Sequence, residues 1–119
     1  MGKVHQVATV AELPVGTQKI IQIGRRSIGL FNVNGSLHAL PNLCPHQLGP
    51  LCEGNVSGTT YSGVETGWKV DWIQEGEIVA CPWHGIEYEI VTGRCLPFPE
   101  ISIRTYKVWA EEDAIYIEL

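Results

Sequence analysis

Residues 44–46 read Cys-Pro-His, and residues 81–84 read Cys-Pro-Trp-His. Each of these two motifs supplies one thiol and one imidazole, and a glycine follows at Gly49 or Gly85. Proline fixes φ directly after each cysteine, whereas glycine allows the backbone to turn tightly. The motifs therefore predict two loops that present their side chains to a common site, and we expect most of the remaining sequence to be scaffold for those loops.

The four candidate ligands are Cys44, His46, Cys81 and His84. Buried thiols and core histidines would explain one such motif, but two matching motifs indicate a metal site. Two thiolates and two imidazoles suit a [2Fe–2S] cluster in which one iron binds both sulfurs and the other binds both nitrogens. Zinc uses the same ligand set and remains an alternative. A zinc finger, however, carries its histidines on a helix, and no helical periodicity is evident in this sequence.

Composition is consistent with one domain over residues 1–119, with 45% hydrophobic residues and a net charge of −5. This charge provides no broad basic surface for nucleic acid or an anionic membrane. There is neither an 18-residue apolar run nor a secretion signal, so we expect a cytoplasmic protein with no membrane partner. In a reducing cytosol, Cys52 and Cys95 are expected to be small buried residues without a redox role.

Short β-rich runs alternate with glycine, proline and asparagine, which is typical of a small all-β domain. Asn34-Gly35 predicts a hairpin turn, and Glu112-Asp113 a second one. Residues 55–76 are interpreted as an inserted hairpin or loop. The strands that we expect are Val4–Thr9, Lys19–Ile23, Ser27–Val33, Ser36–Leu40, Glu77–Ala80, Ile86–Glu89, Ser102–Ala110 and Ala114–Leu119.

The two motifs, followed by Thr92-Gly93, resemble those of the Rieske ferredoxin and oxygenase family, and the resemblance runs from about Val7 to Leu119. It implies stacked antiparallel sheets with one [2Fe–2S] cluster at the tip of two loops. By the same resemblance, Cys44 and Cys81 would bind the buried iron, and His46 and His84 the outer iron.

The resemblance also bears on the reduction potential. High-potential relatives carry a serine two residues after the second histidine and a tyrosine four residues after it, and both donate hydrogen bonds to sulfur. Here Ile86 and Tyr88 occupy those positions. Loss of one donor predicts a potential toward the low end of the Rieske range, about −150 mV. Tyr88 is interpreted either as the remaining donor or as a half-buried strand aromatic.

The function implied by the resemblance is electron transfer by a ferredoxin component. It would pass single electrons from a flavin-dependent reductase to a terminal ring-hydroxylating oxygenase. Catalysis by the chain alone is not expected, because His5 and His38 are the only histidines left for a mononuclear iron. The alternative is a small Rieske subunit of a larger reductase, resembling the nitrite reductase small subunit.

Two features of the sequence are candidates for binding surfaces. Trp68 and Trp72 would serve an obligate subunit as an apolar docking surface, but packing of the inserted strand onto the domain is the preferred explanation for them. Arg25-Arg26 is interpreted as a solvated turn rather than an anion site.

Overall fold

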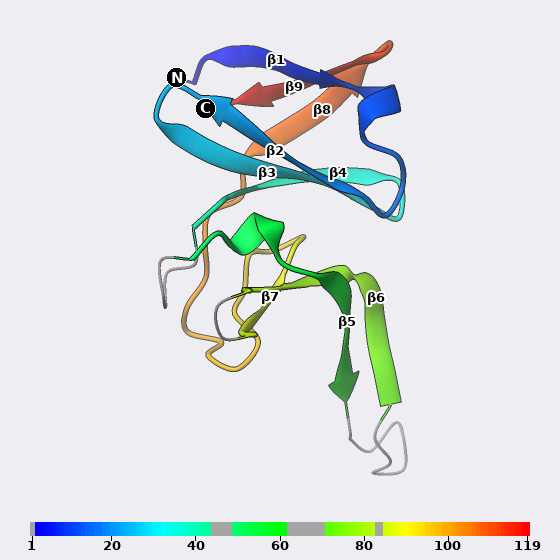
Figure 1. Ribbon diagram of the computed structural model, residues 1–119, viewed down its shortest axis with the longest axis vertical. Coiled ribbons are helices and arrows are strands. Elements are labelled where there is room, and N and C mark those ends of the chain that lie inside the picture. The colour runs from blue at the N-terminus through cyan, green and yellow to red at the C-terminus, as the bar shows by residue number, and fades with distance from the viewer. Residues whose placement is uncertain (1, 44–48, 62–70, 83–84) are drawn as a thin grey trace.

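The computed structural model describes residues 2–43, 49–61, 71–82 and 85–119. In these residues the protein consists of three three-stranded antiparallel sheets and two short 3₁₀ turns (Figure 1). This arrangement confirms the predicted all-β class of stacked antiparallel sheets. No helix in the described part of the chain is long and apolar enough to cross a membrane.

Each sheet has a distinct strand order. The first sheet is β1-β9-β8, the second β2-β3-β4 and the third β5-β6-β7. The strands are β1 (Val4–Thr9), β2 (Gln18–Ile23), β3 (Arg26–Val33), β4 (Ser36–Pro41), β5 (Val56–Tyr61), β6 (Asp71–Ala80), β7 (Glu87–Glu89), β8 (Lys107–Glu111) and β9 (Ala114–Glu118). The 3₁₀ turns are η1 (Val10–Glu12) and η2 (Leu51–Glu53).

Two predicted hairpin turns are present. Asn34 and Gly35 both have positive φ, 52° and 98°, between β3 and β4. Such a turn matches the right-handed twist of the flanking strands, and asparagine and glycine tolerate it best. Glu112 has φ 56° in the turn between β8 and β9.

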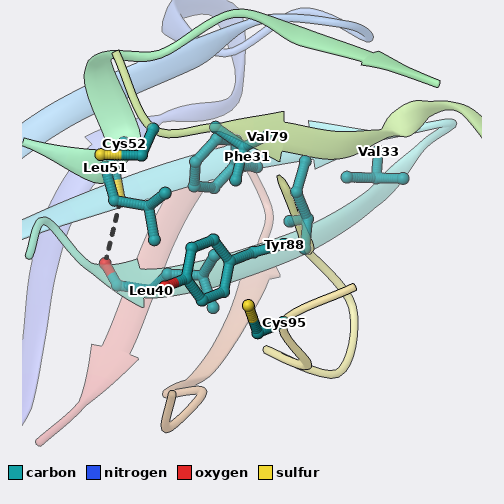
Figure 2. Close-up of a cluster of buried hydrophobic side chains, with 10 residues drawn as sticks. Phe31, Val33, Leu40, Leu51, Cys52, Val79, Tyr88 and Cys95 are labelled. Atoms are coloured by element: carbon teal, nitrogen blue, oxygen red, sulfur yellow. Dashed lines mark hydrogen bonds between the residues drawn. The ribbon is translucent and has the colours of Figure 1, made fainter. Parts of the chain in front are cut away.

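Two hydrophobic cores lie between the layers. One core joins the first and second sheets and includes Ile28, Leu30, Ile115 and Ile117. The other joins the second sheet to η2 and the third sheet, and Figure 2 shows its side chains. This second core contains Phe31, Val33, Leu40, Leu51, Cys52, Val79, Cys81, Tyr88, Ile90 and Cys95. It therefore connects the scaffold to the segment that carries the second motif.

The predicted strand Ser102–Ala110 was wrong in its first half, because β8 begins at Lys107. Residues before it cross from the third sheet to the first and make single bridges, Ser102 with Arg94 and Tyr106 with Ala39. A β-rich pattern does not reveal that a segment changes neighbours along its length. This crossing brings the residues just before β8 against the end of β4.

The hairpin of β5 and β6 in the third sheet is longer than the sequence predicts. β6 begins at Asp71 rather than Glu77, and it pairs with β5 with an irregularity between Ser57 and Thr59. Gly76, at φ 79°, lies within the long strand β6. The view of residues 55–76 as an insertion stays a prediction, and Trp68 lies outside the described residues.

Candidate metal centre

Cys81 is the one predicted ligand that the structure describes. It follows β6 directly, and its exposed fraction is 1%. Cys44, His46 and His84 lie outside the described residues, so their arrangement as ligands stays a prediction. What the structure does describe is the backbone on either side of both motifs.

The second motif is closed by two backbone hydrogen bonds. The Cys81 N–H donates to the Ile86 carbonyl at 2.9 Å, and the Gly85 N–H donates to the Cys81 carbonyl at 2.8 Å. Gly85 has φ +70°, which favours glycine because a side chain is strained there. The chain therefore reverses within a few residues between β6 and β7, and Cys81 is fixed at the start of this tight turn.

The segment after the first motif is anchored by η2. The Cys52 N–H donates to Asn42 Oδ1 at 2.8 Å, and Asn42 Nδ2 donates to Glu53 Oε2 at 3.2 Å and to Ser27 Oγ at 3.1 Å. Asn42 thus ties the chain before the first motif to the chain after it.

Gln18 supplies a second anchor for the same turn. Its Nε2 donates to the carbonyl oxygens of Cys52 and Gly54. Sequence reasoning missed both Gln18 and Asn42. Gln18 is 34 residues from Cys52, so no local spacing could have identified it.

The flanks of the two motifs share one pocket of about 320 Å³. Its walls are Glu53, Gly54, Asn55, Ala80, Cys81, Pro82 and Gly85. Leu51 and Cys81 also belong to the same buried cluster. A buried thiol at the wall of a pocket that the flanks of both motifs line fits a cluster that needs thiolate from each motif. The described residues are therefore compatible with the [2Fe–2S] ligand set predicted above.

Cys52 and Cys95 are buried free thiols, as expected. The Cys52 Sγ donates toward the carbonyl oxygens of Leu40 and Pro41, at 3.5 and 3.4 Å; the bond to Leu40 is dashed in Figure 2. Burial raises the pKa of the Cys52 thiol to about 12. At neutral pH this thiol is protonated and serves as a packing and hydrogen-bonding group.

Tyr88 is wholly buried, not half-buried as one interpretation held. It pairs with Val79 across β6–β7 and belongs to the cluster that contains Cys81 and Cys95 (Figure 2). No buried side-chain oxygen or nitrogen in the described residues lacks a hydrogen-bond partner. The phenol is therefore a satisfied polar group within the core that supports the pocket.

Comparison with known proteins gives a consistent family assignment. The model of the Rieske [2Fe-2S] domain matches residues 3–107. Apoptosis-inducing factor 3 from Homo sapiens is 30% identical over 112 residues, which are 93% of this chain but only 16% of that protein. The ferredoxin component of a naphthalene 1,2-dioxygenase system from Pseudomonas aeruginosa is 27% identical, covering 91% of this chain and 88% of that protein.

Solved structures match over nearly the whole chain. A ferredoxin from Sphingomonas yanoikuyae B1 superimposes with a TM-score of 0.72 at 26% identity, covering 98% of this chain and 99% of the other. A Mycobacterium tuberculosis protein described as the small subunit of an NADH-dependent nitrite reductase gives a TM-score of 0.75, covering 100% and 96%. Its identity is 19%, so this second match concerns the fold alone.

Proposed function

The chain belongs to the Rieske [2Fe-2S] domain family, and we propose that it is a one-electron carrier whose cluster is held by Cys44, His46, Cys81 and His84. A [2Fe–2S] cluster bound there takes up and releases a single electron. The observation that carries the proposal is the pocket shared by the flanks of both motifs, with the buried Cys81 in its wall.

The protein's own residues position the flanks of the two motifs and keep water away from Cys81. The hydrogen bonds of Gln18 and Asn42 hold η2 in place, and the core around Leu51 and Tyr88 excludes water behind Cys81. The closed turn between Cys81 and Ile86 orients the second motif. Well-anchored flanks of the two motifs suit electron transfer, because little reorganisation is then needed between redox states.

The proposed partners are a flavin-dependent reductase as donor and a terminal oxygenase as acceptor, met in transient contacts of small area. The dioxygenase ferredoxin component, similar over most of both chains, supports this choice. The proposed compartment is the cytoplasm, where the buried thiols Cys52 and Cys95 would stay reduced. The second candidate is a small subunit of a larger reductase, favoured by the fold match to the nitrite reductase small subunit.

The test is a potentiometric titration of the purified protein followed by electron paramagnetic resonance (EPR) spectroscopy, with iron, sulfide and zinc analysis and size-exclusion chromatography. We expect a Rieske-type spectrum with a midpoint near about −150 mV from a monomer. A colourless zinc protein would refute the proposal. A Rieske-type protein that aggregates alone and becomes stable only with one stoichiometric reductase partner would favour the second candidate.

Tyr88→Phe should lower the midpoint potential without loss of iron. If the buried Tyr88 hydroxyl donates toward a cluster sulfur when the cluster is bound, its removal disfavours the more negative, reduced state. A hydrogen bond worth about 1 kcal/mol corresponds to ~40 mV for one electron. Redox titration of the variant measures this shift, with Tyr116→Phe on β9 as the matched control. An unchanged potential in Tyr88→Phe would assign the buried phenol a packing role only.

A further inference from the structure

A second pocket, of about 430 Å³, is lined by the segment that leads into the first motif. Arg25 contributes from the β2–β3 turn, Arg26 from the first residue of β3, and Arg104 from the crossing segment before β8. The rest of its wall is Ser27, Pro41, Asn42, Leu43 and Tyr106. Arg25 lies in an exposed turn, as the sequence indicated, whereas the exposed Arg26 begins β3, and the fold adds a third arginine from almost 80 residues further along the chain.

This pocket adjoins the candidate metal centre. Leu43 lines it and immediately precedes Cys44. Asn42 also lines it, and the Asn42 amide donates to Glu53, which lines the pocket beside Cys81. The two pockets therefore lie on either side of one side-chain hydrogen bond.

The charge of the pocket is opposite to that of the whole protein. The net charge is −5, yet three of the four arginines in the sequence gather here. Within the part of the chain that the structure describes, the ion pairs are Lys19–Glu12 and Arg94–Glu89, so neither involves these three guanidinium groups. None of the described residues that line this pocket is acidic, and Glu53, which accepts the Asn42 hydrogen bond, lines the first pocket instead.

Leu43 and Tyr106 add apolar surface to the arginine pocket. The Arg104 guanidinium carbon lies 4.9 Å from the centre of the Tyr106 ring, a cation–π distance. Leu43 is 50% exposed beside it. Exposed guanidinium groups around a leucine and a tyrosine form the pattern common in protein interfaces, where arginine and aromatic residues are enriched and carboxylates pair with the guanidinium fork.

We propose that this three-arginine pocket is a docking surface for an acidic patch of a redox partner protein, which it orients against the side of the molecule that carries the first motif. The inference rests on the proposed electron-transfer function. Complementary charge beside an electron-transfer site raises the encounter rate and sets orientation, and its effect weakens with salt. An acidic carrier with one local basic pocket would accept an acidic partner in this orientation and repel it in others.

The first test measures binding to immobilised polyglutamate at low ionic strength. We expect the intact protein to be retained despite its net negative charge. The variant R25Q/R104Q should elute in the void volume, whereas K3Q/K19Q, with the same change in net charge outside the pocket, should be retained like the wild type. Equal loss of retention in both variants would overturn the docking surface. Elution by phosphate, but not by chloride of equal ionic strength, would replace it with a small-anion site.

The second test measures electron transfer to probes of opposite charge. In stopped flow, one electron passes from the dithionite-reduced protein to ferricyanide, giving oxidised protein and ferrocyanide. We expect R25Q/R104Q to slow this reaction about fivefold at ~0.1 M ionic strength and more in dilute buffer, and to speed reduction of the cation hexaamminecobalt(III). K3Q/K19Q should change either rate less than about twofold.

EPR spectra distinguish failure of the proposed electron-transfer function from failure of the docking surface alone. A wild-type protein without a Rieske-type spectrum would refute the proposed function itself. Rieske-type spectra and equal potentials in all three proteins, with equal ferricyanide rates, would refute only the docking surface.

Discussion

Cys81→Ala should lose its iron and its Rieske-type EPR signal almost completely. Deleting one of two thiolates leaves an iron without a full set of ligands, and a cluster that binds only the folded state contributes to its stability. Iron should fall at least tenfold from about two atoms per chain, and the thermal midpoint should fall with it. Iron and sulfide analysis, EPR and thermal unfolding measure these changes.

Cys95→Ala is the matched control, because Cys81 and Cys95 are each 1% exposed and belong to the same core cluster. The same sulfur atom is deleted from the same environment, at a cost of about 1 kcal/mol from lost burial. Cys95→Ala should therefore keep its iron and EPR signal while unfolding at a slightly lower temperature. Full iron content in Cys81→Ala, or equal iron loss in both variants, would contradict the assignment of Cys81 as a ligand.

The fold could be predicted where local chemistry decides the structure. Asn34-Gly35 specifies its turn by tolerance of positive φ, and the alternating runs on either side specify β3 and β4. The strand Ser102–Ala110 was misjudged because its pairing depends on distant partners. Tyr106 bridges Ala39 and Ser102 bridges Arg94, and neither partner is encoded in the local pattern.

In the candidate site, too, local motifs predict some features and tertiary structure determines the others. The buried thiol Cys81 and the turn at Gly85 follow from motif chemistry. The supports of the site do not, because Gln18 and Asn42 act through backbone carbonyl and amide groups of η2. Arg104 likewise joins Arg25 only through the path of the chain before β8. Motifs thus identify the residues with special chemistry, whereas residues that hold them in place emerge from tertiary structure.

Gly54→Ala should destabilise the protein by about 3 kcal/mol, the upper end of the usual cost of overpacking. A Cβ at Gly54 would overlap the carbonyl oxygen of Ala80. The Ala80 carbonyl and the Cys81 N–H belong to the same peptide group. This N–H donates to the Ile86 carbonyl. Relief of the overlap must therefore displace the backbone of the second motif, so iron content and the EPR line shape should change as well. Denaturant unfolding and EPR measure the two effects.

Backbone conformation does not explain this glycine. Gly54 has φ −76° and ψ 173°, which any residue adopts, so its role is to allow η2 to approach β6 closely. Gly16→Ala provides the control, because Gly16 has φ +81° and no atom lies within 4 Å of its Cβ position. Gly16→Ala should cost about 1 kcal/mol from left-handed backbone strain and leave the EPR spectrum unchanged. Equal stability losses in the two variants, with unaltered spectra, would show that close approach at Gly54 does not position the Cys81 peptide.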